Sequence, residues 1–452
     1  MQAIHAASAC LPEGWAGAVR VEIDGPNIAS VTPGAEMRPG DMRVDILLPA
    51  LSNLHSHSFQ RAMAGRTEQR VAGRDSFWTW REVMYRFVER LTPEQVQAIA
   101  ALAFCEMQEA GYAAVAEFHY LHHGPGGAAY ARPAELAHRI CGAAAETGIG
   151  LTLLPVFYRY GGAGKAPLAG GQLRFGCDPA RFAALLEDAR AGLRELPGDA
   201  AIGIAPHSLR AVAPEDLGAV LPLAGDGPVH IHIAEQPREV AEISAWLGAR
   251  PVEWLLANAP VGPGWCAVHA THMTGAEAAA LAASGAVAGL CPITEANLGD
   301  GAFGGPGWIA AGGGFGVGSD SNVRIALGEE LRMLEYSQRL RDLGRNLLVP
   351  EPGHSGGFLY RGALAGGARA LGRASGAIAA GRLADLLALD GAHPALAGLA
   401  GEAVLDGLVF AAGRGIVGDL WSAGRHMVTG GRHVARTAIR ARYAAAMREL
   451  LA

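Results

Sequence analysis

The sequence predicts an α/β protein, a (β/α)8 TIM-like barrel with a small β-sandwich built from both chain ends. Apolar strand-like runs alternate with helix-like segments between residues 48 and 372. Short alternating runs, separated by glycine or proline, occur before residue 48 and return after residue 372. Polar, metal-capable side chains follow most strand-like runs of the middle region, where a parallel barrel carries its functional groups.

These patterns divide the chain into four segments. Residues 1–47 and 373–435 are expected to supply the two parts of the sandwich, and residues 48–372 the barrel. Residues 436–452 are expected to form a terminal helix. The strand-like runs at the two ends are residues 18–23, 28–31, 384–389, 407–410 and 427–428.

The composition is that of a globular protein with a large core. The chain has 452 residues, of which 50% are hydrophobic and 18% charged, and a net charge of -6. Nothing in this balance suggests a nucleic-acid or membrane-surface partner. The absence of a signal-peptide pattern and of a long apolar run predicts a cytoplasmic protein without a membrane span. Six scattered cysteines without a C-x-x-C pair agree with a reducing compartment.

The middle region shows the strand and helix alternation of parallel βαβ units. Thr92 and Pro93 are typical of an N-cap and a first helical position, and they predict a helix to about residue 111. Further helices are predicted at residues 133–147, 179–196, 237–249 and 275–285. Strands are predicted at residues 44–51, 113–118, 150–157, 201–205, 229–233, 267–268, 286–290 and 315–318. About eight such units would close a barrel.

His55 and His57 follow the first of these strands. Residues two apart on a strand share a face, so the two imidazoles would form half of a metal site. The same two residues could instead be polar side chains at the entry to a loop. The other strand-end residues are His119, Tyr120, Tyr158, Arg159, His207, Arg210, His232, Glu235, His269, His272, Ser319 and Asp320. Metal-capable groups at so many strand ends are difficult to explain by packing alone.

Two of these positions have rivals nearby. His232 is preferred to His230 as a ligand because it lies nearer the strand end, and His269 is preferred to His272 for the same reason. Glu235 suits a general acid/base three residues beyond a ligand, although a helix N-terminus would also favour its carboxylate.

Asp320 and a nearby group of histidines also allow two interpretations. Asp320 can be a carboxylate ligand or a turn residue in Gly-Ser-Asp-Ser-Asn. The histidines at 119, 122 and 123 are expected to form a solvated loop cluster without a part in the site.

Taken in order, these residues resemble the amidohydrolase superfamily. The pieces that carry the resemblance are His55-x-His57, His232 with Glu235 in His-Ile-Ala-Glu, His269, Asp320, the frame 48–57 and the later segment 376–387. The resemblance implies a metal ion at the barrel mouth, with His55, His57, His232 and Asp320 as ligands. A second metal would need a bridging lysine, and the chain's one lysine, Lys165, lies in a glycine-rich loop. The mononuclear deaminases are therefore the closer match.

Within that branch, the sequence is similar to the formimidoylglutamate deiminases of histidine degradation. The matching pieces are residues 55–65, 76–85, 117–120, 206–210 and 232–236. The resemblance implies a substrate pocket lined by Gln60, Arg81, Tyr120, His207 and Arg210. Two arginines can each clamp one carboxylate of a dicarboxylate substrate. Taken singly, Arg81 could instead cap a surface helix, and Arg210 could pair with a helix carboxylate.

The resemblance also implies the reaction, in which N-formimidoyl-L-glutamate is hydrolysed to N-formyl-L-glutamate and ammonia. One Zn2+ per subunit, with Fe2+ or Mn2+ as alternatives, would activate water. Asp320 and His269 would orient that water, and Glu235 would transfer its proton. A homodimer is expected at the level of the superfamily. The alternatives are another deaminase of this branch, for example one acting on guanine, and a non-catalytic barrel used as a scaffold.

Overall fold

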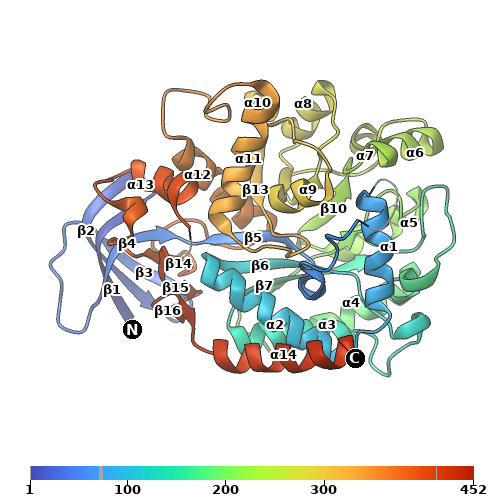
Figure 1. The fold of residues 1–452 in the computed structure, drawn as a ribbon, viewed down its shortest axis with the longest axis horizontal. Helices are drawn as coiled ribbons and strands as arrows, with labels where there is room; N and C mark the ends of the chain where they lie inside the picture. The colour runs from blue at the N-terminus through green and yellow to red at the C-terminus, as the bar shows by residue number, and fades with distance from the viewer. Residues whose placement is uncertain (1, 71–74, 414) are drawn as a thin grey trace.

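The computed structural model describes residues 2–70, 75–413 and 415–452. Strands from the two chain ends lie side by side in one eight-stranded sheet, with the order β17-β16-β15-β14-β4-β1-β2-β3 (Figure 1). The bounds are β1 (Gln2–Leu11), β2 (Gly14–Asp24), β3 (Asn27–Thr32), β4 (Met42–Pro49), β14 (Leu386–Leu389), β15 (Val417–Ser422), β16 (Arg425–Thr429) and β17 (Arg432–His433). The predicted association of the two ends is therefore observed, through the antiparallel pairing of β4 with β14.

The middle of the chain forms two parallel sheets. The first contains β5 (Leu51–Ser56), β6 (Tyr112–His119), β7 (Gly150–Phe157) and β8 (Ala201–Ile202), with β9 (Ala205–Pro206) paired to β7; the second contains β10 (Val229–Ile233), β11 (Trp265–His269), β12 (Val287–Leu290) and β13 (Gly314–Val317). Isolated parallel bridges join the sheets at both edges, Ser56 to Asp320 and Ile204 to Val229. Strands β5, β6, β7, β10, β11 and β12 are buried along their whole length, as expected where helices cover parallel strands.

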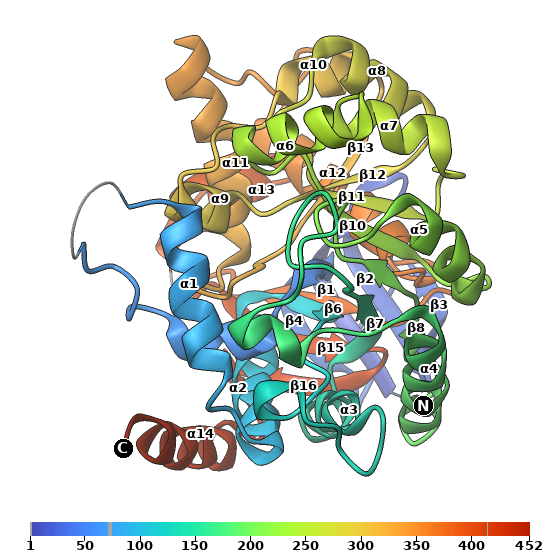
Figure 2. The same cartoon turned by 90° about the vertical axis from the view of Figure 1, so that its right-hand side faces the viewer.

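The predicted helices of the middle region are confirmed, and they surround the parallel strands (Figure 2). They are α2 (Pro93–Ala110), α3 (Glu135–Thr147), α4 (Pro179–Leu193), α6 (Pro237–Leu247) and α8 (Gly275–Ala283). The Thr92 side chain caps α2 by accepting the backbone N–H of Gln95, and Gly111 ends the helix at a φ of 106°. The other helices here are α1 (Phe77–Val88), α5 (Pro214–Val220), α7 (Pro251–Asn258), α9 (Pro292–Leu298), α10 (Gly305–Ala310), α11 (Leu327–Asp342) and α12 (Ser355–Ala370).

Two predicted strands differ from the structure. Residues 44–51 were expected to form the first parallel strand, but residues 44–49 belong to β4 of the eight-stranded sheet, and the parallel sheet begins with β5. Residues 407–410 lie in a π-helical segment, η6 (Gly407–Ala411), which continues α13 (Ala403–Asp406). Leu408 and Val409 are buried in the main core there. The short apolar run therefore packs as a helical turn, an ambiguity that periodicity cannot resolve over four residues.

The C-terminal helix is confirmed as α14 (Arg436–Leu451), which lies along α2 (Figure 1). Ile439, Met447 and Leu450 form its buried face. None of the helices in the described ranges has the length and apolar character that a membrane span requires.

Candidate active site

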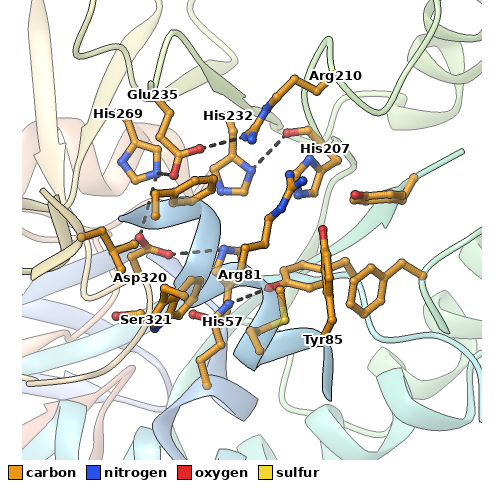
Figure 3. A pocket seen from close by; sticks show the side chains of 18 residues that line it. His57, Arg81, Tyr85, His207, Arg210, His232, Glu235, His269, Asp320 and Ser321 are labelled. Atoms are coloured by element: carbon orange, nitrogen blue, oxygen red, sulfur yellow. Dashed lines mark hydrogen bonds and ion pairs between the residues drawn. The ribbon is translucent and has the colours of Figure 1, made fainter. Parts of the chain in front are cut away.

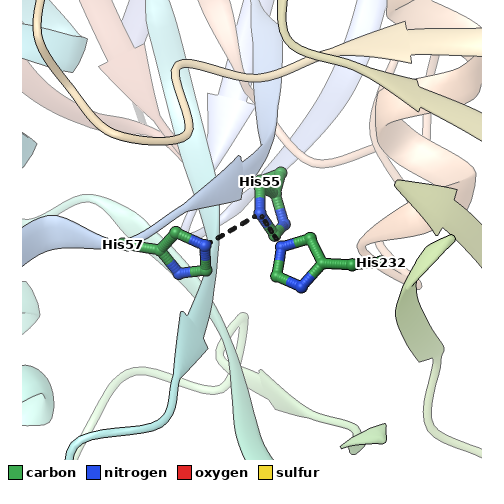
Figure 4. Close-up of side chains that lie close together, drawn as sticks. All are labelled: His55, His57 and His232. Atoms are coloured by element: carbon green, nitrogen blue, oxygen red, sulfur yellow. Dashed lines mark hydrogen bonds between the residues drawn. The ribbon is translucent and has the colours of Figure 1, made fainter. Parts of the chain in front are cut away.

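Three histidine side chains converge where β5 and β10 end (Figure 4). The Nε2 atom of His55 lies 3.2 Å from Nε2 of His57 and 3.1 Å from Nε2 of His232. All three rings are buried. The structure therefore brings together the three histidines that the sequence predicts as metal ligands.

Hydrogen bonds from the Nδ1 atoms of His57 and His232 fix the direction in which the Nε2 lone pairs point. Nδ1–H of His57 donates to the carbonyl oxygen of Phe118 at 3.0 Å, and Nδ1–H of His232 donates to that of His207 at 3.1 Å. Neutral rings held in this way turn bare Nε2 lone pairs toward one another. Such convergence is unfavourable without a cation between the nitrogens, so the donor set fits a metal ion.

Burial keeps these imidazoles neutral. Desolvation, together with a smaller contribution from the neighbouring His55, lowers the pKa of His57 to about 3. Desolvation also moves the pKa values of His55 and His232 well below the usual range. Because a metal competes with protons for the same lone pairs, neutral rings favour binding.

Asp320 lies beside the cluster, after the end of β13. Its Oδ1 is 3.3 Å from Nε2 of His57 and 3.5 Å from Nε2 of His55. Its backbone N–H donates to the carbonyl oxygen of His55, and its carbonyl accepts the N–H of His57. Asp320 has a φ of 45°, which is uncommon for a residue other than glycine. The backbone thus holds this carboxylate against the histidines.

A buried polar clamp fixes the same turn. The clamp consists of Asn53, Ser319 and Asn322, which lie on β5 and after β13. Asn53 donates to the Ser319 hydroxyl at 2.6 Å, and that hydroxyl donates to Oδ1 of Asn322 at 2.6 Å. Nδ2 of Asn322 lies within 3.2 Å of the carbonyls of His57 and Asp320. The sequence analysis missed Asn53 and Asn322, although both lie within three residues of a predicted ligand.

Glu235 and His269 lie side by side in the pocket, and both are close to Asp320 (Figure 3). Oε1 of Glu235 lies 3.7 Å from Nε2 of His269, which is 3.9 Å from Oδ2 of Asp320. Burial alone would lower the pKa of His269, but Glu235, Glu295 and Asp320 raise it to about 10. Two acidic groups and an imidazole thus share one small volume, as acid-base chemistry requires.

Arg210 combines the two interpretations that its sequence position allowed. Its Nη2 donates to Oε2 of Glu235 at 2.8 Å, and its Nε lies 3.9 Å from Oε2 of Glu239. The pairing with a carboxylate is therefore observed, and Arg210 also lines the pocket. Glu239, which the sequence analysis missed, accepts the backbone N–H groups of Ala234 and Glu235 and so fixes the turn that carries the acid.

The pocket has an empty volume of about 530 Å³ and contains all five predicted substrate-binding residues. Nε2 of Gln60 donates to the Tyr120 hydroxyl at 2.6 Å. Arg81 stacks on Trp78 at 4.7 Å and on Tyr85 at 5.5 Å, and it pairs with no carboxylate among residues 2–70, 75–413 and 415–452. The residues along the wall are His57, Gln60, Phe77, Trp80, Arg81, Met84, Tyr85, Tyr120, Tyr158, Phe175, His207, Arg210, His232, Glu235, His269, Leu298, Asp320 and Ser321.

The rival histidines lie outside the cluster. Nε2 of His230 hydrogen-bonds to the carbonyl of Ala370, and Nε2 of His272 to that of Asp300. Lys165 is exposed and paired with Glu215. Each of these side chains has a structural partner away from the three converging nitrogens.

The predicted solvated cluster at 119, 122 and 123 is wrong, because all three histidines are buried. The segment around Arg174 covers the loop, and the carbonyl of Arg174 accepts the backbone N–H groups of His122 and His123. Nε2 of His122 also pairs with the carbonyl of Val156. Sequence position alone cannot reveal this cover, which comes from a segment about 50 residues further along the chain.

Comparisons with known proteins agree with the site. Residues 46–427 match the Amidohydrolase family model, and the chain belongs to that family. Residues 1–45 match a model described as Formimidoylglutamate deiminase HutF, N-terminal domain. The chain is 52% identical over 436 residues to a formimidoylglutamate deiminase from Pseudomonas aeruginosa, covering 96% of each chain. An 8-oxoguanine deaminase from the same organism is 28% identical and covers 78% of each chain.

Solved structures show the same fold. An amidohydrolase from Brucella melitensis is 49% identical, with a TM-score of 0.96 and full coverage of both chains. An adenosine deaminase from Xanthomonas campestris with bound zinc has a TM-score of 0.82 at 24% identity, covering 99% of this chain and 98% of its own. The family and its architecture are therefore established for nearly the whole length.

Proposed function

We propose that this chain is a metal-dependent formimidoylglutamate deiminase, which hydrolyses N-formimidoyl-L-glutamate to N-formyl-L-glutamate and ammonia. The observation that carries the proposal is one pocket lined both by two histidines of the cluster, His57 and His232, and by two arginines. An amidine head can meet the metal side while the guanidinium groups of Arg81 and Arg210 bind two carboxylates. The 52% identity to a formimidoylglutamate deiminase supports the same substrate.

The architecture that goes with this function is a closed (β/α)8-type barrel spanning residues 48–372. The two bridges that join the parallel sheets at their edges support closure. Residues 1–47 and 373–435 are proposed to form the accompanying β-sandwich, which the single eight-stranded sheet shared by both chain ends supports, and residues 436–452 the terminal helix. In this arrangement the pocket lies at the carboxyl ends of the strands.

The metal is proposed to be one zinc ion. His55, His57, His232 and Asp320 would hold it, since three neutral imidazoles and a carboxylate suit Zn2+, with Fe2+ or Mn2+ as alternatives. When bound, zinc lowers the pKa of a coordinated water to roughly 7.

The protein's own groups then move the protons. Asp320 and His269 orient the attacking water toward the formimidoyl carbon, and Glu235 takes up its proton. Glu235 passes that proton to the imino nitrogen, which gives a tetrahedral adduct with one hydroxyl and one amino group. The remaining hydroxyl proton then moves to the amino nitrogen by the same carboxylate, the carbon–nitrogen bond breaks as the formyl C=O forms, and ammonia leaves. Arg210 holds Oε2 of Glu235, which leaves Oε1 directed toward His269.

The carboxylate end of the substrate is proposed to lie against α1, and residues of the neighbouring loops would contact the amidine. Arg81, with no carboxylate partner among the described residues, is free to bind an incoming carboxylate. Gln60 has a buried Oε1 without a hydrogen-bond partner, which can accept a hydrogen bond from the substrate amidine. Tyr120 fixes Gln60, and His207 lies against the same wall.

The test is ammonia release by the zinc-loaded protein from N-formimidoyl-L-glutamate, beside N-formimidoyl-L-aspartate, guanine and cytosine. Release from the glutamate derivative in clear preference to the others is expected. Release from a base alone would assign the chain to the other deaminases and remove the role of the two arginines. No release from any of the four would overturn the proposal and favour a scaffold.

A further inference from the structure

A carboxylate lies at the Nδ1 edge of His269, opposite the Nε2 atom that faces the reacting groups. Oε1 of Glu295 lies 3.2 Å from Nδ1 of His269. Both side chains are buried, with 1% of His269 and 4% of Glu295 exposed. The mechanism above assigns no task to Glu295, which does not line the pocket.

Glu295 is itself held firmly. It lies in the first turn of α9, and the same Oε1 accepts the backbone N–H of Cys291 at 2.9 Å. Its carboxylate therefore meets two donors, a backbone group at the start of the helix and the imidazole. The helix N-terminus adds favourable charge to this position.

The opposite nitrogen of His269 faces the reacting groups. Nε2 lies 3.7 Å from Oε1 of Glu235 and 3.9 Å from Oδ2 of Asp320. The residue has a φ of 66°, so its backbone also occupies a conformation that favours glycine. The ring thus lies between the Glu295 carboxylate at Nδ1 and the carboxylates of Glu235 and Asp320 near Nε2.

We propose that Glu295 is a positioning residue for His269, which holds Nδ1–H so that Nε2 faces the attacking water and Glu235. A carboxylate on one ring nitrogen fixes the orientation of the ring and hence the direction of the other nitrogen, as in the serine-protease triad and in metal-site histidines. The inference rests on the proposed deiminase function, because it assigns Glu295 a part in that reaction.

The competing explanation is that Glu295 only caps α9. Glu330 provides a matched control, since its buried Oε2 accepts the backbone N–H of Ile293, two residues beyond Cys291. No hydrogen bond or ion pair joins Glu330 to His269 in the described part of the chain. Desolvation raises the pKa of Glu330 well above its usual range, so a neutral glutamine should replace it with little effect.

The experiment compares Glu295→Gln with Glu330→Gln in the zinc-loaded, full-length protein, using N-formimidoyl-L-glutamate. For Glu295→Gln, kcat is expected to fall by about 10- to 100-fold. KM is expected to stay within about threefold and zinc content at one per chain. Glu330→Gln is expected to retain kcat within about twofold. Equal losses in the two variants, or unchanged kcat in Glu295→Gln, would overturn the inference.

A second measurement separates positioning from a loss of structure. In the His269→Asn background, adding Glu295→Gln should change the residual kcat by less than about twofold, because the interaction partner is already gone. The full 10- to 100-fold loss in that background would show that Glu295 acts independently of His269. An unmodified protein that releases no ammonia would instead overturn the proposed function, so the two failures are distinguishable. If residual activity after His269→Asn is undetectable, the Glu295→Gln and Glu330→Gln comparison decides.

Discussion

The two sides of the pocket are built differently. The proposed metal side consists of four buried side chains at or just beyond strand ends, His55, His57, His232 and Asp320. Hydrogen bonds fix their backbones or rings. The substrate side is formed in part by α1. Its Arg81 side chain is half-buried and is held by stacking on aromatic rings. The hydroxyl of Tyr85, also on α1, accepts a hydrogen bond from Nε2 of Gln172.

This difference separates the groups that carry out the reaction from the groups that recognise the substrate. Groups that handle the metal and the protons must keep sub-ångström geometry, and strand ends supply it. Groups that recognise the substrate can sit on an element with fewer fixed contacts. Substitutions on the first side should therefore alter kcat or metal retention, and those on the second side KM.

The largest expected effect is at Glu235. Glu235→Gln removes the group that transfers protons, and general acid–base catalysis of this kind contributes roughly 10²- to 10⁴-fold. We expect kcat to fall within that range while zinc content and substrate binding persist. Steady-state kinetics and metal analysis of the same preparation provide the check. A variant that loses zinc would place Glu235 among the ligands and break the division between the two sides.

Arg81→Met tests the substrate side. Loss of a hydrogen bond to a charged group costs about 1.5–3 kcal/mol, or roughly a 10- to 150-fold rise in KM. The value of kcat should change far less. Arg238→Met is the matched control, because Arg238 also stacks on Trp78 but does not line the pocket. A fall in kcat with constant KM would show that α1 positions reacting groups as well.

Asn322→Ala sharpens the account of the metal side. Removing Nδ2 releases the carbonyls of His57 and Asp320 from the clamp. Partners of metal ligands typically contribute 10- to 100-fold, so we expect zinc affinity to fall by at least about tenfold. Competition with a chromophoric chelator measures it. Asn258→Ala removes an exposed hydrogen bond to Trp254 and should leave zinc affinity unchanged.

The smallest effect on activity is expected at His119, whose burial instead affects stability in acid. Desolvation lowers the pKa of His119 to about 3, from about 6.5 in an unfolded chain. Between these values the unfolded chain binds more protons, so the free energy of unfolding falls as the pH falls from 6.5 to 3. The metal-free His119→Gln protein should lose about 1.4 kcal/mol per pH unit less than the unmodified protein in this window. Denaturant titrations at several pH values measure the slope, and an unchanged slope would contradict the burial of a neutral ring.

The sequence predicted that three histidines would converge, for a physical reason. A candidate ligand at the end of an apolar run, such as His57 or His232, is placed by the strand itself, and strands can be predicted from the local pattern. The turn at Asp320 was ambiguous from sequence, and the structure resolves its position through backbone bonds to β5.

Long-range pairing explains what the sequence did not predict. Glu295 follows β12 and meets His269 after a separation of 26 residues, and the Arg210 contact with Glu235 spans 25. Neither distance corresponds to a helical or strand period, so only the assembled structure reveals them. The burial of His122 has the same origin, since a distant segment covers it.

The backbone hydrogen bonds between β5 and the turn after β13 have a consequence for synthesis of the protein. His57 and Asn322 lie 265 residues apart in sequence. The Asp320 carboxylate is held beside His55 and His57 only once these backbone bonds have formed. A nascent chain therefore lacks a complete ligand set until nearly three quarters of it has been synthesised. Metal binding should therefore follow the folding of most of the chain, and a stalled or truncated chain should fail to retain the ion.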